Sequence, residues 1–366
     1  MNINGFSKNE LFDLIWTKPT LAQIELTRKC NQNCCFCFQG CKSNNEYNDL
    51  SLDEWKLIIK KLKSLGVNIL NFSGGEVFLY SDFIELLDFS KNLGFKIVVN
   101  TNGTIDVTDA VKYIDELIFS IHGLPSTHNL IVGNTSSFNK IEKNVSIANS
   151  SKTSILINMT IIKENFNEIE AVFNYFNKKY NIDKFSPTIA IQSNTGSIIS
   201  QSNVLDLNSD LFKEYFSILD RIPPEKLNLK HGLHCIYNNN KLDYKDSQIK
   251  SPNCIGGKFK LIIQYDGSVY PCNFFLIDDF YCGNILTENE FDIWKNGKGF
   301  NLFRNLVFEE KVPDDCKKCI KLDKCYSGCR AWTEKYRKGF SNTTNGGCIY
   351  NEQDLRCKIT NAFIGN

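Results

Sequence analysis

Three cysteines spaced C-x3-C-x2-C near the start of the sequence could hold a metal cluster. They are Cys30, Cys34 and Cys37, within the segment RKCNQNCCFCFQGC. Three thiolates on one short loop can bind three irons of a cubane cluster, which leaves the fourth iron open to another ligand. An open coordination position separates a catalytic metal site from a structural one. A zinc knuckle is the alternative, but zinc knuckles usually bring four ligands in closely spaced pairs.

A second group of cysteines lies in the C-terminal third of the sequence. Its spacing is Cys254-x12-Gly267-x4-Cys272, then Cys316-x2-Cys319-x5-Cys325-x3-Cys329, then Cys348. Sites of four thiolates suit zinc and iron–sulfur clusters alike, so the spacing by itself leaves the metal open. The chain has 15 cysteines, an odd number, and none between positions 41 and 235. This distribution favours metal or redox chemistry over a disulfide framework.

Charge and hydropathy exclude several classes of function. The 366 residues include 42 Lys+Arg and 41 Asp+Glu, which gives a formal net charge of +1. A balance this close to zero does not support binding to nucleic acid or to an anionic membrane. No apolar run reaches the roughly 18 residues of a membrane span. Lys8, Glu10 and Asp13 interrupt the N-terminal segment, so it is not a signal peptide, and we expect a cytoplasmic protein.

Regular elements must position these cysteines, and the first two hundred residues alternate between two patterns. Apolar runs predict strands at Ala22–Thr27, Val67–Phe72, Phe95–Asn100, Glu116–Ile121, Ser154–Ile162 and Lys184–Ile191. Three- and four-residue apolar spacing predicts helices at Leu52–Leu65, Ser81–Leu93, Val107–Tyr113, Phe138–Asn149 and Phe166–Tyr180. Repeated strand–helix alternation predicts an α/β fold with a parallel sheet, either open or curled into a barrel. In both cases ligands bind at the carboxyl ends of the strands.

The pattern changes after about residue 205. A helix is predicted at Leu207–Ile222, before Pro223, and from there the chain is punctuated by cysteines. Asp266-Gly267, flanked by apolar residues, predicts a β-hairpin turn. A short cysteine-rich segment of this kind buries little core and needs a metal to hold it together. We therefore place a domain boundary near residue 225.

The cysteine triad, with Phe36 before its last member, resembles the motif of the radical-SAM superfamily. The resemblance covers residues 20–200 in order and implies a partial (β/α)6 barrel. It also implies a [4Fe–4S] cluster on Cys30, Cys34 and Cys37 whose open iron chelates S-adenosylmethionine. Cleavage of that cofactor gives a 5′-deoxyadenosyl radical that abstracts a substrate hydrogen. The expected domains are an N-terminal extension (1–20), the barrel (21–225) and a cysteine-rich domain (226–366).

Polar residues at the ends of successive strands extend this resemblance. Ser73, Gly74, Gly75 and Glu76 resemble the family's GGE-type motif; two glycines allow close backbone approach, and Glu76 can accept from the methionine ammonium. By analogy, Phe36, Asn100, Asn102, Ser120 and Asn158 face the cofactor or substrate. Alternatives remain: Asn102-Gly103 can be a simple turn, Asn158 an ordinary polar edge residue, and His122 a structural histidine.

The C-terminal cysteines resemble the seven-cysteine SPASM motif, and Gly283–Ile285 and Phe291–Trp294 resemble the link between its halves. The resemblance implies two auxiliary [4Fe–4S] clusters. The inner cluster would take Cys254, Cys272 and Cys329, and the outer cluster Cys316, Cys319, Cys325 and Cys348. Cys235 is the candidate for the eighth ligand and Cys282 the second choice; a vacant iron is the third possibility. Cys35, Cys41 and Cys357 are left as small apolar residues or exposed thiols.

Auxiliary clusters suit oxidation, because a substrate radical must lose one more electron. SPASM enzymes mostly modify ribosomal peptides or protein side chains, so we expect a peptide or protein maturase that forms an oxidative cross-link with an external low-potential electron donor. Sulfatase-maturing relatives carry an aspartate where this chain has Asn273, which disfavours formylglycine formation unless Asp278 or Asp279 substitutes. About twenty residues precede the first strand, too few for a leader-binding domain, so a separate leader-binding protein is an option. A small-molecule dehydrogenase acting on a sugar or aminocyclitol is the alternative, and a non-catalytic iron–sulfur or zinc scaffold is a third.

Overall fold

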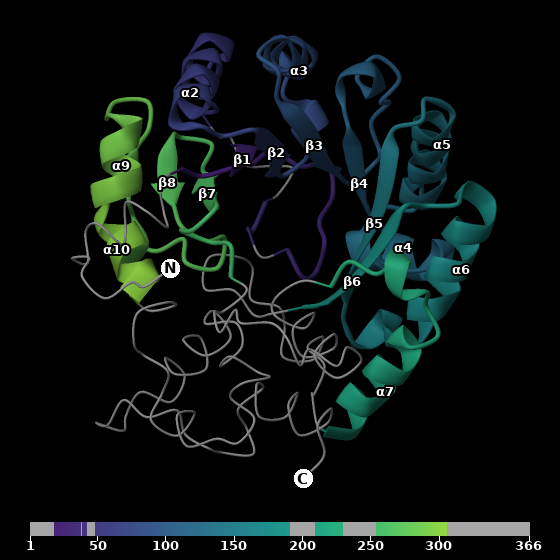
Figure 1. Cartoon of the computed structure of the whole chain (residues 1–366). Helices are drawn as coiled ribbons and strands as arrows, with labels where there is room; N and C mark the ends of the chain where they lie inside the picture. Colours follow the sequence, from purple (N-terminus) through teal and green to yellow (C-terminus); the bar gives the residue numbers. More distant parts are fainter. Residues whose placement is uncertain (1–17, 38, 42–47, 191–208, 230–253, 306–366) are drawn as a thin grey trace.

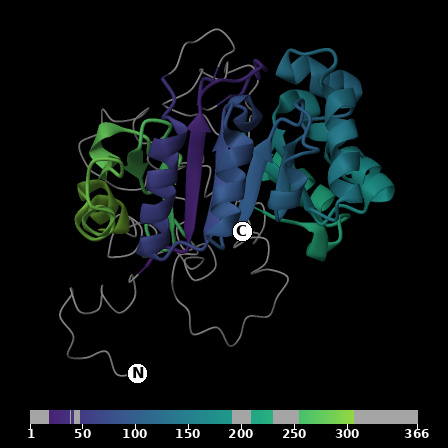
Figure 2. The same cartoon turned by 90° about the horizontal axis from the view of Figure 1, so that it is seen from above.

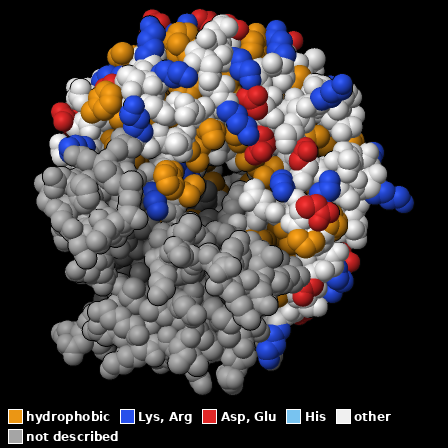
Figure 3. Space-filling view, viewed as in Figure 1, with side chains coloured by type: hydrophobic (Ala, Val, Ile, Leu, Met, Phe, Trp, Pro, Cys, Tyr) orange, Lys and Arg blue, Asp and Glu red, His pale blue; other side chains and the backbone are white. Residues whose placement is uncertain are grey.

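A computed structural model of the chain describes residues 18–37, 39–41, 48–190, 209–229 and 254–305 (Figure 1). Most of the predicted C-terminal cysteines lie outside these residues: Cys235, Cys316, Cys319, Cys325, Cys329, Cys348 and Cys357. In the described part, Lys/Arg and Asp/Glu side chains are interspersed over the visible face, as the near-zero net charge predicts (Figure 3). Helices long and apolar enough to cross a membrane are not found among the described residues.

Six parallel strands form the curved sheet that the alternation predicted. They are β1 (Leu21–Thr27), β2 (Ile69–Gly74), β3 (Lys96–Thr101), β4 (Glu116–Ser120), β5 (Ser154–Ile161) and β6 (Lys184–Ile189). Each begins and ends within two residues of its predicted range. They pair in the order β6-β5-β4-β3-β2-β1, so each strand lies beside the one that precedes it in the chain. This order, with crossover helices, is that of a partial (β/α)6 barrel.

The outer, convex face of this sheet is covered by α2 (Leu52–Leu65), α3 (Phe83–Asn92), α5 (Ser137–Ser150) and α6 (Ile169–Tyr180) (Figures 1 and 2). The other described helices are α4 (Pro125–Val132), α7 (Ser209–Leu219), α9 (Glu290–Asn296) and α10 (Lys298–Arg304). Helix α2 has the predicted bounds because both ends carry strong signals. Ser51 and Glu54 form a capping box at its start, and Gly66 ends it in the left-handed conformation.

Two helix predictions differ from the structure. The predicted helix Val107–Tyr113 is wrong: only one 3-10 turn forms there, Val111–Tyr113. Its β-branched residues disfavour a helix, and the segment is too short to gain much from packing. Helix α4 was not predicted, because its eight residues are too few to show a helical periodicity. Its signals were Pro125 at the first turn and Gly133 just past the end, with φ of 65°.

The hairpin of the cysteine-rich part extends the barrel sheet instead of forming a separate one. Strand β7 (Lys260–Ile263) pairs in parallel with β1, and β8 (Ser268–Tyr270) pairs antiparallel with β7, followed by β9 (Gly283–Asn284). The predicted turn at Gly267 is confirmed, with φ of 84°. The nine-stranded sheet is therefore continuous across the boundary that we predicted near residue 225. The domain boundary near residue 225 stays a prediction, and the strands on its two sides belong to one sheet.

Alternation along β1 separates the core from the inner face of the sheet. Ala22, Ile24 and Leu26 pack in the main core beneath the helices. Gln23 and Glu25 alternate with them and so point to the concave side. The register continues this inner face across the barrel, where it carries an apolar tier of Ile69, Val98, Ile118 and Leu156. Nearer the carboxyl ends of the strands, the same face carries a polar tier of Asn71, Ser73, Asn100, Ser120, Asn158 and Ser186.

Candidate active site

The three cysteines of the first motif lie together on the loop that follows β1. Cys30, Cys34 and Cys37 are all half-buried and free of disulfides. The C-terminal end of α4 holds the loop, because the Asn33 amide donates to the Val132 carbonyl (3.1 Å) and the Cys35 amide to the Ile131 carbonyl (3.3 Å). The helix that the sequence pattern missed thus fixes the position of the cysteine loop.

The donor set of this loop fits an iron–sulfur cluster. Burial raises the pKa of Cys30 to about 11, and burial followed by the neighbouring Cys30 and Cys37 raises the pKa of Cys34 well above its usual value. Three thiolates this close in a desolvated loop need a cation to balance them, which cluster irons would supply. Groups of three His, Cys, Asp or Glu side chains arranged around a single metal ion are not found among the described residues. A cubane differs from such a site because it takes one thiolate on each of three irons.

Cys41 contacts this site, although we expected it to be a left-over residue. Its side chain is buried, and its thiol bonds to Cys37 and to the Gln39 side chain (3.4 Å). The hydrogen bond from Cys41 lowers the pKa of Cys37 to about 6. The burial agrees with the expected small apolar residue, and the structure adds a contact with Cys37, four positions earlier in the sequence.

The two glycines of the GGE-type motif pack against the backbone of the cysteine loop. The Gly75 amide donates to the Thr27 carbonyl (2.7 Å), and the Glu76 amide donates to the Lys29 carbonyl (2.8 Å). A Cβ added at Gly74 would lie 2.4 Å from the Thr27 carbonyl oxygen, and one at Gly75 would lie 2.1 Å from that of Lys29. The glycines are thus required by the approach of two loops of this chain, in addition to any approach to a ligand.

Glu76 is fully buried and bonded within the chain. One carboxylate oxygen accepts from the Phe78 amide (3.2 Å) and the Thr101 hydroxyl (2.8 Å), and the other from the Asn102 amide (2.7 Å). Burial raises its pKa to about 7 despite these bonds. These bonds tie the end of β2 to the end of β3. That Glu76 also accepts from the methionine ammonium stays a prediction.

Asn102 lies beside the first cysteine of the triad. Its side-chain nitrogen is 3.9 Å from the Cys30 sulfur and donates to the Asn31 side chain (2.7 Å). Gly103 has φ of 67°, so the predicted turn also exists. The two alternatives for Asn102-Gly103 are therefore compatible: the turn places the amide against the cysteine loop.

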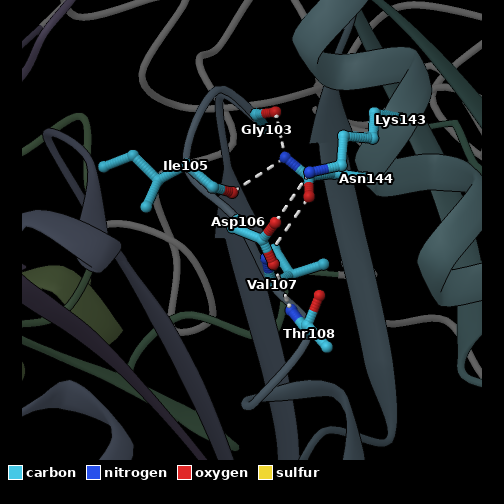
Figure 4. Close-up of polar contacts among 7 residues, drawn as sticks. All are labelled: Gly103, Ile105, Asp106, Val107, Thr108, Lys143 and Asn144. Carbon is cyan, nitrogen blue, oxygen red and sulfur yellow. Dashed lines mark hydrogen bonds and ion pairs between the residues drawn. The ribbon is translucent and has the colours of Figure 1, made fainter.

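Asn144, on α5, holds the loop that follows Asn102 (Figure 4). Its side-chain nitrogen donates to the carbonyls of Gly103 and Ile105 (both 2.8 Å), and its oxygen accepts from the Val107 amide (3.3 Å). Sequence reasoning missed this residue, because an asparagine in a helix carries no local signal of a contact some forty residues away.

The remaining predicted polar residues face the inner side of the barrel. Ser120 and Asn158 are paired neighbours on β4 and β5, and both are half-buried. Ser73 pairs with Glu25 on β1, and the Asn100 side chain donates to Asn71 and to the Phe72 carbonyl. The structure thus brings these side chains to one polar surface, where a ligand with hydroxyl and carboxylate groups would find donors and acceptors. Their roles toward a cofactor stay predictions.

Phe36 packs against His122, with ring centroids 4.6 Å apart. His122 is buried, and its Nδ1 accepts from the Thr160 amide (3.1 Å). Burial, followed by the neighbouring His128, keeps its pKa well below the usual value, so the ring is neutral near pH 7. These contacts agree with the structural interpretation of His122.

Two cysteines of the second group, Cys254 and Cys272, flank β7 and β8 and are half-buried. Asn273 donates to the Glu25 carboxylate on β1 (3.4 Å). The alternative acids, Asp278 and Asp279, are exposed. Cys282, the second choice for the eighth ligand, is buried and donates to the Phe280 carbonyl (3.4 Å). Cys235, the candidate for the eighth ligand, lies outside the described residues.

Glu25 is the residue that sequence reasoning missed most clearly. Its carboxylate is 2% exposed and accepts from Gln23 (2.6 Å), from Gln39 on the cysteine loop and from Asn273. It therefore connects the loop of Cys37 with the residue next to Cys272. A charged residue at an inward position of a parallel strand was the available signal, since the inner strands of such sheets are usually apolar.

Comparisons with protein families match both parts of the chain. Residues 24–176 match the model of the Radical SAM superfamily, and residues 254–320 match that of the SPASM iron–sulfur cluster-binding domain. An AdoMet-dependent heme synthase of Methanosarcina barkeri is 26% identical over 86% of this chain and 91% of its own length.

Two further comparisons find a maturation protein and a complex with a precursor peptide. The sporulation killing factor maturation protein SkfB of Bacillus subtilis is 25% identical over 75% of this chain and 64% of its own length. The structure of Streptococcus suis SuiB bound to its precursor peptide SuiA superposes with a TM-score of 0.71, at 20% identity, over 88% of this chain and 74% of that one. The structural likeness shows a common fold.

Proposed function

The chain belongs to the radical-SAM superfamily and carries a SPASM domain, and on this basis we propose that it oxidises a side chain of a ribosomally made peptide or of a protein. The product would be a cross-link or a similar modification that leaves the substrate two electrons more oxidised. The chain is an enzyme whose cofactors are a [4Fe–4S] cluster, auxiliary iron–sulfur clusters and S-adenosylmethionine, as its two domains imply.

Cys30, Cys34 and Cys37 would hold the cluster of the radical site, and Cys254 and Cys272 would hold part of the auxiliary site; all five are free of disulfides. The bound cluster supplies reductive cleavage of S-adenosylmethionine, which yields the radical that removes a hydrogen atom from the substrate. The chain's own part is to position the reactants. Asn102 and the GGE-type segment fix the cysteine loop, and Ser120 and Asn158 offer hydrogen bonds on the inner face.

One observation carries the proposal of an oxidation: β7 lies beside β1, and Asn273 reaches Glu25. Because of this pairing, the segment next to Cys272 and the loop of Cys37 both contact the same buried carboxylate. A substrate on the inner face would lie between a site that removes a hydrogen atom and a site that can take an electron. The substrate would lose one hydrogen atom, one electron and one proton, a balanced two-electron oxidation.

A peptide or protein substrate is supported by the names of SkfB and of the SuiB–SuiA complex. A separate leader-binding protein and an external low-potential electron donor belong to the same proposal. The second candidate is oxidation of a small organic molecule, and the heme synthase relative supports it because the two chains align over most of their lengths. The sequence suggested a sugar or an aminocyclitol as the small molecule, whereas this relative points to a tetrapyrrole.

The experiment compares the two substrate classes in one assay. The anaerobically reconstituted enzyme is given S-adenosylmethionine and dithionite with either short peptides encoded beside its gene or an iron porphyrin. Mass spectrometry should find a peptide lighter by two hydrogens, formed in step with 5′-deoxyadenosine. Conversion of the porphyrin with unchanged peptides would reject the peptide proposal and establish the second candidate.

A further inference from the structure

A lysine on the cysteine-rich side faces the same interior as Glu25. Lys260 begins β7, and the pairing of β7 with β1 places it on the inner face with Gln23. Its ammonium nitrogen donates to the Gln23 side-chain oxygen (2.6 Å), and Gln23 donates to Glu25 (2.6 Å). A continuous line of hydrogen bonds thus runs from Lys260 through Gln23 to Glu25 and on to Gln39 in the cysteine loop.

Lys260 lies beside the two auxiliary cysteines. Its amide donates to the Ile255 carbonyl (2.9 Å), next to Cys254. The antiparallel register pairs Ile262 with Tyr270, and Lys260 and Cys272 each lie two residues beyond this pair, toward the open end of the hairpin. Burial lowers the pKa of the Lys260 ammonium, and Cys272, Glu25 and Cys254 act electrostatically against this shift.

The charges on the inner face are therefore ordered along this line. The basic side chain of Lys260 stands on the side of the auxiliary cysteines, and the acidic side chain of Glu25 stands on the side of the cysteine loop, where it accepts from Gln39. Reduction of an iron–sulfur cluster adds one negative charge and moves no atom. A cation close to the cluster stabilises the reduced form, and an anion destabilises it, most strongly where water is excluded.

We propose that Lys260 sets the reduction potential of the auxiliary cluster held by Cys254 and Cys272, and that Glu25 opposes it through the same hydrogen-bonded line. This inference rests on the proposed function, since it explains how the electron released by the substrate is drawn to the SPASM side. Lys260 and Glu25 act here as positioning charges, because neither is a ligand in this account. The electron comes from the substrate in the reaction and from dithionite in the test.

The test measures a potential and needs neither substrate nor S-adenosylmethionine. A background with Cys30, Cys34 and Cys37 replaced by Ala leaves only the auxiliary clusters. A redox titration followed by electron paramagnetic resonance reads their midpoints, and that of the cluster on Cys254 and Cys272 is compared between variants. Lys260→Met should shift the midpoint to more negative potential, and Glu25→Gln to more positive potential. Lys260→Arg keeps the charge and should stay near the parent value.

The matched control is Lys61→Met. Lys61 lies on α2, on the outer side of the sheet, and bonds to the carbonyls of Ile285 and Glu288 (both 2.8 Å). The Lys61→Met variant also loses one positive charge, but at a position outside the inner face, so the midpoint should stay unchanged. An unchanged midpoint in Lys260→Met, or equal shifts in Lys260→Met and Lys61→Met, overturns the proposal.

The two variants should shift the midpoint in opposite directions, which a general folding defect would not do. Should Lys260→Met fail to load iron, Glu25→Gln decides, since a shift of that variant to more negative potential also contradicts the proposal. A shift as expected in an enzyme that forms no modified peptide would reject the proposed substrate and leave this inference standing. The two failures are therefore distinguishable.

Discussion

The two cysteine sites of this chain differ in how the sequence builds them and in what surrounds them. The radical site is one short loop, with Cys30, Cys34 and Cys37 inside eight residues, and its supports are amides and a buried carboxylate from the ends of β2 and β3. The auxiliary pair is assembled from a hairpin that joins the sheet at β1 and has Lys260 beside it. The difference suggests a division of labour: hydrogen bonds between neighbouring loops hold the first site beside the carboxylates of Glu25 and Glu76. The second site has the Lys260 side chain nearby, which we propose favours electron acceptance.

The largest expected effect separates the two sites directly. Cys34→Ala removes one of three ligands and should abolish 5′-deoxyadenosine formation, because the cluster that cleaves the cofactor cannot form. Cys272→Ala should retain 5′-deoxyadenosine and lose the oxidised product, since only the electron acceptor is impaired. Chromatography of both products in one reaction checks this. Loss of 5′-deoxyadenosine in both variants to the same extent would remove the distinction between the sites.

A second substitution should damage the radical site alone. Gly75→Ala places a Cβ 2.1 Å from the Lys29 carbonyl oxygen, so the cysteine loop must move. Misplacement of this size can lower the rate of 5′-deoxyadenosine formation by about 100-fold. The matched control is Gly94→Ala, where φ is also positive (75°) but the nearest side-chain atom is 3.8 Å away. Equal rates for the two variants would show that the close approach at Gly75 does not position the loop.

The third prediction uses pH to probe the support of the radical site. The pKa of Glu76 is raised by burial from 4.5 to about 7, so the folded protein holds a proton that the unfolded chain releases. This contribution to the free energy of unfolding is fully present below pH 4.5 and is lost as pH rises through 7, by up to about 3 kcal/mol. Urea unfolding of the cluster-free protein between pH 5.5 and 8 measures it. Glu76→Gln should flatten that slope, and an unchanged slope would contradict the assignment.

The smallest effect concerns the loop behind Asn102. Asn144→Ala leaves the carbonyls of Gly103 and Ile105 without their donor in a buried place, which should cost about 2 kcal/mol in the free energy of unfolding. Asn149→Ala, on the exposed side of the same helix, is the control and should change stability by less than about 0.5 kcal/mol. Denaturant midpoints compare the two. Similar values would mean that α5 does not hold this loop through Asn144.

The sequence predicted the sheet well because parallel strands and amphipathic helices carry strong periodic signals. It also placed Cys30, Cys34, Cys37 and the GGE-type segment at strand ends, where the structure has them. Short elements were less predictable: α4 spans only eight residues, and the segment 107–113 forms one turn in place of a helix. Neither is long enough for an apolar stripe to outweigh local effects.

Contacts between distant segments could not be predicted from the periodic patterns of the strands and helices. The pairing of β7 with β1 brings Lys260 and Asn273 to Gln23 and Glu25, across more than two hundred positions of the chain. The bonds from Thr101 and Asn102 to the Glu76 carboxylate are likewise seen only in the structure. Local spacing identifies which side chains can do chemistry, whereas tertiary contacts decide which of them bind ligands and which hold others in place.

The most direct test of this account is the formation of 5′-deoxyadenosine by the anaerobically reconstituted chain with S-adenosylmethionine and dithionite. A variant with Cys30, Cys34 and Cys37 all replaced by Ala, loaded with iron in parallel, is the control. The account predicts 5′-deoxyadenosine from the native chain and none from the variant. Equal amounts from both, or none from a fully iron-loaded native chain in the presence of its candidate substrates, would contradict it and favour a non-catalytic iron–sulfur scaffold.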